Sequence, residues 1–257
     1  MPTLRRLTFR GVITYLDNLV ARINTPLLER LTLTLFFEHP VTLVNLTKFI
    51  QRTERFGCSV ARIIFNNDGA SMYTNDYKQQ GIGKLSLHVN CEPPNWKMDS
   101  VTMAFSALRG VLSVVEELTF DLDEDGMPSE WRNTLDNTLW HELLLPFVSV
   151  KNLHIGSCGS SIAFRLARAL ELKVGGLVLP ELQVLQVPLE FFHARNVFFT
   201  FIETRKLMGH PVRLLATILP PLRHRPENSR DSNPAGILMR ASERSERELK
   251  LSAWRGT

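Results

Sequence analysis

One short apolar pattern recurs seven times along this chain and limits what the chain can fold into. Each copy is an aliphatic residue, two variable positions, a second aliphatic residue, one variable position and a third aliphatic or aromatic residue. The copies are Leu4/Leu7/Phe9, Leu28/Leu31/Leu33, Val60/Ile63/Phe65, Ile82/Leu85/Leu87, Val115/Leu118/Phe120, Val150/Leu153/Ile155 and Leu182/Leu185/Val187. Their central residues are 22 to 35 positions apart, about the length of one strand plus one helix. The spacing therefore predicts a chain of repeated strand-helix units.

Amphipathic periodicity fills most of the intervals between these strands. Apolar residues recur at helical spacing over residues 15–23, 42–50, 98–112, 139–145, 160–170 and 197–208. The interval after residues 60–65 starts with the turn signal Asn66-Asn67-Asp68-Gly69, and no helix is predicted there. The fold class predicted is α/β: a leucine-rich-repeat-like solenoid of about seven irregular strand-helix units with one parallel sheet and the helices behind it.

Charge divides the chain into two parts. Residues 212–257 hold nine Arg and Lys against five Asp and Glu, whereas residues 1–211 hold 21 of each, so the net charge of +4 comes from the C-terminal part. Within it, residues 223–234 and 242–248 have few side chains able to pack, so no fold is expected from about residue 220 onward, and Trp254 is the only aromatic residue of 212–257. We therefore expect a leucine-rich-repeat-like domain over residues 1–211 and a disordered basic tail over residues 212–257. Without aromatic platforms, nucleic acid is not an expected partner.

Cysteine usage and hydropathy indicate an intracellular protein. Cys58, Cys91 and Cys158 are odd in number and lack metal-ligand spacing, which favours buried thiols in a reducing compartment. The N-terminal residues contain no apolar core of a secretory signal. Charged residues and prolines interrupt the apolar stretch over residues 170–192, so no membrane span is expected. We expect the cytoplasm or the nucleus.

Alternation along each strand gives a candidate binding surface. If the repeat positions face the core, the residues between them face away from it. The charged and histidine side chains on that face are Arg6, Arg10, Arg30, Arg62, Lys84, His88, Glu117, Asp121 and His154. The first four strands carry the basic residues and the fifth carries the acidic ones, so we expect a polarised face on which an acidic partner segment docks. The alternative is an ordinary solvated sheet face.

Motifs for catalysis and metal binding are incomplete. Asp121-x-Asp123-x-Asp125-Gly126 matches the first half of a calcium loop, but Arg132 stands where the bidentate glutamate is needed, so a solvated acidic insertion is the alternative. Gly81-Ile-Gly-Lys lacks the upstream glycine of a phosphate-binding loop. Ser157 and Cys158 have no base beside them in the sequence, and His141-Glu142 lacks a second histidine. We predict no catalytic residue, metal or cofactor and no enzyme, with a hydrolase as the remaining alternative.

Several segments resemble the repeat region of fungal F-box proteins abundant in mushroom-forming species. The resemblance covers about residues 1–211 and follows one order along the chain. The segments are Leu4-Arg-Arg-Leu-Thr-Phe-Arg-Gly, residues 15–31, Phe49-Ile-Gln-Arg-Thr-Glu, Glu130-Trp131, Leu143-Leu-Leu-Pro-Phe, Val150-Lys-Asn-Leu and Gly209-His-Pro.

The resemblance implies a protein-interaction role. In such proteins the repeats select substrates for a cullin-RING ubiquitin ligase, while a separate F-box binds the ligase adaptor. Residues 1–257 begin inside the first repeat and include no F-box, so we expect an unknown protein partner and not the adaptor. A repeat fragment without function is the alternative. Without a preceding cap, Leu4, Leu7 and Phe9 are expected at an open end, prone to aggregation or to pairing with further sequence.

Overall fold

The structure is a computed structural model of the 257-residue chain. It describes residues 4–36, 43–53, 59–66, 69–74, 84–90, 98–122, 137–156, 160–171, 177–189 and 196–217. All of these lie in one compact unit, residues 1–219.

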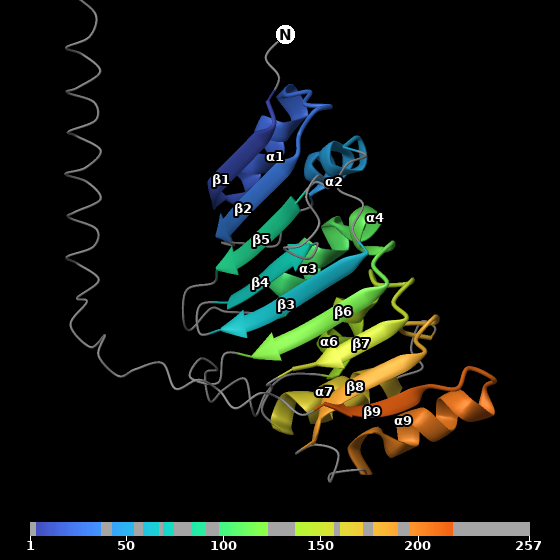
Figure 1. Ribbon diagram of the computed structural model, residues 1–257. Coiled ribbons are helices and arrows are strands. Elements are labelled where there is room, and N and C mark those ends of the chain that lie inside the picture. The colour runs from blue at the N-terminus through green and yellow to red at the C-terminus, as the bar shows by residue number, and fades with distance from the viewer. Residues whose placement is uncertain are drawn as a thin grey trace, which may run out of the picture. The chain divides into compact units, whose positions relative to one another are not determined.

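One nine-stranded sheet organises this unit (Figure 1). The strands are β1 (Arg6–Val12), β2 (Arg30–Phe36), β3 (Val60–Asn66), β4 (Gly69–Thr74), β5 (Lys84–Asn90), β6 (Glu117–Leu122), β7 (Asn152–Ile155), β8 (Val184–Pro188) and β9 (Arg213–Thr217). Their order in the sheet is β1-β2-β5-β4-β3-β6-β7-β8-β9. Every neighbouring pair is parallel except the two that involve β4. The predicted α/β class with a mostly parallel sheet is therefore confirmed.

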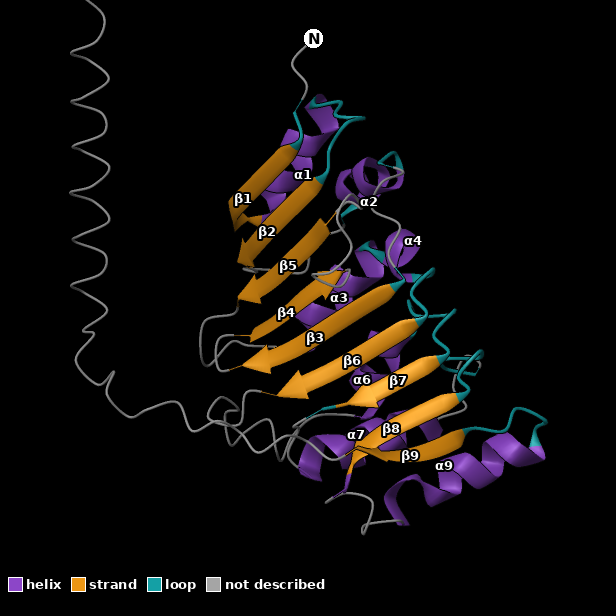
Figure 2. Cartoon of the chain, viewed as in Figure 1, coloured by secondary structure: helices purple, strands orange, loops and turns teal. Residues whose placement is uncertain are grey.

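Seven described helices accompany the sheet. They are α1 (Ile13–Arg22), α2 (Val44–Gln51), α3 (Met98–Ala107), α4 (Arg109–Leu112), α6 (Asn137–Leu144), α7 (Ser160–Glu171) and α9 (Asn196–Leu207). Figure 2 shows these helices gathered on one side of the strands. Burial agrees, because Leu31, Leu33 and Leu35 are fully buried while Thr32 and Thr34 between them are only half-buried. The core therefore lies between the helices and one face of the sheet.

A repeated backbone contact explains the sequence pattern. The first aliphatic residue of a unit sits in a turn before its strand, as with Leu28, whose N–H donates to the Thr25 carbonyl and whose side chain is fully buried. Just before four of the strands, β1, β3, β6 and β7, one carbonyl then accepts two successive N–H groups of the neighbouring unit. These carbonyls belong to Arg5 (from Glu29 and Arg30), Ser59 (from Glu116 and Glu117), Glu116 (from Lys151 and Asn152) and Lys151 (from Gln183 and Val184). The strand starts are thus aligned across the sheet.

The middle of the sheet departs from the predicted succession of units. β3, β4 and β5 form an antiparallel meander, so β5 pairs with β2, and β3 pairs with β6. The prediction of seven parallel strands in sequence order is wrong here. β4 was missed because its core-facing residues, Ala70, Met72 and Thr74, include only one large apolar side chain.

The register of β3 also differs from the prediction. Ala61 pairs with Leu118, and Ile63 pairs with Phe120. Ile63 is therefore two positions further along the strand than its place in the repeat pattern indicates. The outward residues of β3, including Arg62, are displaced by the same amount.

Both edges of the sheet bear on the sequence predictions. At the β1 edge, Leu4 is 38% exposed, and Leu7 and Phe9 are partly buried against the core. At the other edge, β9 lies beyond residue 211, where the predicted repeat domain ends. Arg213–Thr217 pairs with β8 along its whole length, so the sheet extends to Thr217.

Candidate interaction surface

The face of the sheet opposite the helices carries a continuous row of mostly polar residues, one from each strand. In sheet order the row is Thr8, Thr32, Ser86, Tyr73, Arg62, Thr119, His154, Gln186 and Leu215. We call this side of the sheet the open face, since no described helix covers it (Figure 2). Among the described elements, all nine strands are uncovered on this side.

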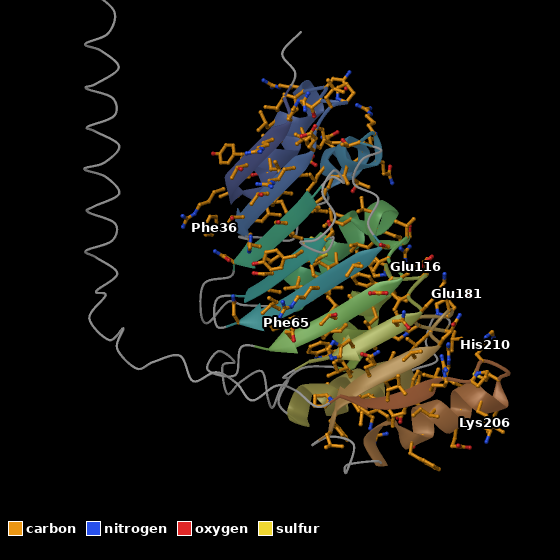
Figure 3. All side chains as sticks on the ribbon, viewed as in Figure 1. Phe36, Phe65, Glu116, Glu181, Lys206 and His210 are labelled. Atoms are coloured by element: carbon orange, nitrogen blue, oxygen red, sulfur yellow. The ribbon has the colours of Figure 1, made fainter. Side chains whose placement is uncertain are left out.

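Arg6, Arg10 and Arg30 lie on β1 and β2, the two strands at one edge of the open face, and we call these three residues the basic corner. Arg6 lies directly opposite Arg30, and the backbone of Lys84 is in register with Arg30 on the next strand. All three arginines are exposed, and none pairs with a carboxylate of the described residues. The Arg10 guanidinium lies 5.7 Å from the centroid of the Phe36 ring, which marks the C-terminal end of β2 in Figure 3. This corner therefore presents positive charge that the described fold does not neutralise.

Arg62 is not part of the basic corner. Two strands, β5 and β4, separate it from Arg30, and its Nε donates to Asp121 Oδ2 at 2.5 Å. The expected basic patch on the first four strands is thus divided. At its β1 end, Arg6, Arg10 and Arg30 have no carboxylate partner among the described residues. Arg62, in contrast, is neutralised by Asp121, which was expected on the acidic side of the face.

Asp121 lies between Arg62 and His154. Its carboxylate covers Gly156, where an added Cβ would collide with Asp121 Oδ1. Burial lowers the pKa of His154; the Asp121 charge raises it, and Arg62 lowers it. The Nε2 atom of His154 is buried and has no hydrogen-bond partner in the described part of the chain. This neutral ring is held beside an ion pair.

A second polar group lies where β4 meets β5, and it was not predicted. Ser71 Oγ lies 3.0 Å from His88 Nδ1, and the Tyr73 ring meets the His88 ring edge-on at a centroid distance of 5.4 Å. Burial lowers the pKa of His88. Ser71 and Tyr73 were missed because β4 itself was missed. No carboxylate of the described residues hydrogen-bonds to His88, so the pair lacks the acid that orients a catalytic histidine.

Glu117 is exposed at the start of β6, in register with Val60 and Asn152. Its neighbour Glu116, which Figure 3 marks at the same strand start, accepts from Lys151 Nζ at 2.8 Å. Of the two acidic residues expected on the open face, Glu117 and Asp121, only Glu117 has no ion-pair partner among the described residues.

The remaining candidates do not form a described chemical site. His141 is buried in the core, and burial lowers its pKa, opposed by Glu142. In the described ranges, no three His, Cys, Asp or Glu residues gather as metal ligands. Asp123 to Arg132, Gly81 to Gly83, Ser157 and all three cysteines lie outside the described residues.

No family model, curated protein sequence or solved structure matches this chain. Within the described residues, no helix combines the length and apolar character needed to cross a membrane.

Proposed function

We propose that this chain is a protein-recognition module that binds its partner on the open face. The observation that carries the proposal is the one-sided architecture: the helices cover one face of the sheet and leave polar side chains of nine strands on the other. Repeat proteins use such extended surfaces to bind partners. The basic corner has no carboxylate partner in the described part of the chain, and this favours a partner segment with acidic residues.

We propose further that the unit is an irregular leucine-rich-repeat-like solenoid with an inserted hairpin. The double acceptance of N–H groups by Arg5, Ser59, Glu116 and Lys151 supports a repeated structural unit. The meander from β3 to β5 is then the irregular part, which interrupts the stacking of one unit on the next.

Within this role, we propose the substrate-recognition region of an F-box protein of a cullin-RING ubiquitin ligase. The support is the sequence resemblance to the repeat region of fungal F-box proteins, together with the structural roles of residues in two of the segments that carry it, 143–147 and 150–153. Leu143, Leu144 and Phe147 are fully buried, and the Lys151 carbonyl makes one of the repeated backbone contacts. These segments therefore specify the framework that presents the open face.

The test is site-directed photo-crosslinking in an extract of the native cells. A photo-reactive phenylalanine analogue replaces Thr32 or Ser86 on the open face and, as the control, Asn18, which is exposed on α1. We expect the same protein to be crosslinked from both open-face positions, and unlabelled chain to compete with it. The absence of a saturable product from the open face, or equal capture from Asn18, would contradict the proposal.

Charge reversal tests the acidic character of the partner. Arg30→Glu is expected to weaken capture because it reverses an unpaired charge of the basic corner. Arg62→Glu should have a smaller effect, since β5 and β4 separate Arg62 from the basic corner. Unchanged capture by the variant carrying both substitutions would rule out an acidic partner segment on this face.

A further inference from the structure

The outer edge of β1 combines three features: a backbone edge that no described strand covers, partly buried apolar side chains, and two arginines without a carboxylate partner in the described residues. β1 pairs with β2 at all seven of its positions, and no described strand pairs with its other edge. An edge strand presents unpaired N–H and C=O groups, which an extended peptide can join by strand addition. As far as the described residues go, the outer backbone edge of β1 is open to a guest strand.

The apolar side of β1 is incompletely covered. Leu7 and Phe9 are only partly buried, whereas their register partners on β2, Leu31 and Leu33, are fully buried. On α1, which follows β1 directly in the chain, Tyr15 is 71% exposed and Leu19 is 38% exposed. Aliphatic side chains of a guest strand would complete the burial of Leu7 and Phe9.

The polar side of β1 carries Arg6 and Arg10, with Thr8 between them. Arg5 has a partner within the chain, Glu29, at 3.0 Å, but Arg6 and Arg10 have no carboxylate partner in the described residues. Two copies of β1 would bring these arginines together, so their charge opposes self-pairing and selects an acidic guest.

We propose that the β1 edge binds an extended acidic segment by strand addition, with acidic residues opposite Arg6 and Arg10 and aliphatic residues beside Leu7 and Phe9. The matching guest has the order acidic, aliphatic, polar, aliphatic, acidic. This order is the same in both directions, so it fits parallel and antiparallel addition. The inference rests on the proposed recognition function and adds a second mode of contact at the edge of the same sheet.

The probe is a fluorescent peptide with the core Glu-Val-Thr-Val-Glu, titrated with the full chain. We expect saturable binding and a change in the amide signals of residues 6–12 in a heteronuclear NMR spectrum. The double variant Arg6→Glu/Arg10→Glu should weaken binding by about tenfold or more. It should gain affinity for the peptide in which both glutamates are lysines. The control Lys206→Glu/Arg213→Glu carries the same charge change away from β1 and should bind as the unmodified chain does.

Backbone methylation separates strand addition from simple charge attraction. In one peptide the amides of the Glu and Thr residues are N-methylated, and in the other those of the Val residues. Only one of these two sets can face β1, because alternate amides of a strand point to opposite sides. We expect one methylated peptide to lose binding and the other to retain it. Equal binding of the two peptides overturns strand addition.

Two further outcomes keep this inference separate from the proposed function. If the probe fails to bind while open-face crosslinking to the native partner persists, the edge inference is wrong and the recognition function stands. Sedimentation of the chain alone measures dimerisation. We expect no dimer whose affinity changes in the Arg6→Glu/Arg10→Glu variant. Such a dimer would assign the edge to a second copy and overturn the proposal.

Discussion

Arg205 shows how one buried charged residue can hold a loop in this fold. It is 1% exposed, and its Nη2 lies within hydrogen-bond distance of the carbonyls of Leu179, Pro180 and Leu182, at 3.3, 3.0 and 3.3 Å. Burial lowers its pKa and Glu181 raises it, but a guanidinium stays protonated in proteins. Arg205 therefore links α9 to the turn that precedes β8.

Replacing Arg205 should destabilise the chain strongly. Arg205→Ala leaves carbonyls without their donor and creates a cavity, so we expect the free energy of unfolding to fall by about 3 kcal/mol. Arg205→Lys should cost less because it keeps a charged donor. Urea unfolding followed by circular dichroism measures both. The exposed neighbour gives the control, since Lys206→Ala should change stability by no more than about 0.5 kcal/mol. Equal effects at the two positions would refute the role of Arg205.

His154 should make stability depend on pH. Its pKa is lowered below the ordinary 6.5, so between these two values the unfolded chain binds more protons than the folded chain. The contribution of His154 is therefore fully present above pH 6.5 and is lost as the pH falls through the folded pKa. We expect His154→Gln to lose less stability than the unmodified chain between about pH 7.5 and pH 5.5. Urea unfolding at the two pH values is the measurement, with exposed His210→Gln as the control. An undiminished pH dependence in His154→Gln would contradict this assignment.

Asp17 shows that an element can depend on a residue far away in the sequence. The N-cap of α2, Leu43, has no side-chain hydrogen bond to the helix. Instead, Asp17 Oδ1 on α1 accepts the N–H groups of Asn45 and Leu46 at 3.0 and 2.9 Å, and Oδ2 accepts from Asn45 Nδ2 at 2.8 Å. The carboxylate thus takes the place of a local cap and complements the helix dipole.

Asp17→Ala should reduce the free energy of unfolding by about 1–2 kcal/mol, because it leaves the first turn of α2 uncapped. Asp17→Asn keeps an acceptor oxygen and should cost less. Thermal and urea unfolding give the comparison, and Asn18→Ala on the exposed side of α1 is the matched control. If Asp17→Ala were as stable as Asn18→Ala, the cap would not contribute.

Thr74 should stabilise the end of β4. Its buried Oγ1 accepts the Leu85 N–H at 3.1 Å and donates to the Leu85 carbonyl at 3.3 Å, so the side chain substitutes for a backbone partner. Thr74→Val removes both contacts at similar volume and leaves a buried N–H unpaired, which should cost about 1–3 kcal/mol. The half-exposed Thr32→Val provides the control in the same urea experiment. A cost at Thr32 as large as at Thr74 would argue against this explanation.

Elements differ in how far the sequence could specify them. Helices α1, α6 and α9 could be predicted because their apolar residues recur at helical spacing. β4 could not, since Ala70 and Thr74 on its core side carry no strong alternation, and its place between β3 and β5 depends on pairing. Local periodicity gives the type of an element, whereas strand order depends on tertiary contacts.

The same limit applies to the candidate surface. Alternation placed Arg6, Arg10 and Arg30 on one face correctly, because all three follow the β1–β2 register. It could not show that Arg62 pairs with Asp121, or that Ser71 meets His88, because both contacts depend on the inserted meander.

At the scale of the whole molecule, β9 is the last described strand and forms one edge of the sheet. β9 pairs with β8, and Leu214 packs against the core. A chain ending at residue 219 should keep its cooperative unfolding, whereas one ending at residue 211 should lose on the order of 3 kcal/mol because β8 becomes an uncovered edge. Differential scanning calorimetry of the two truncated chains and the full chain is the measurement. Equal stability of both truncations would show that β9 is dispensable.

The order of the central strands also has a consequence for synthesis on the ribosome. In an array that stacks in sequence order, each new unit can dock on the previous one as it emerges. Here Leu31 of β2 pairs with Leu85 of β5, and β5 follows β3 and β4 in the chain. β2 can therefore pair with its second neighbouring strand only after β3, β4 and β5 have all been synthesised. The sheet therefore cannot assemble by adding one unit after another in sequence order, starting from β1 and β2. We expect the β3–β5 meander to form first, through contacts close in sequence, and β1 and β2 to join it afterwards.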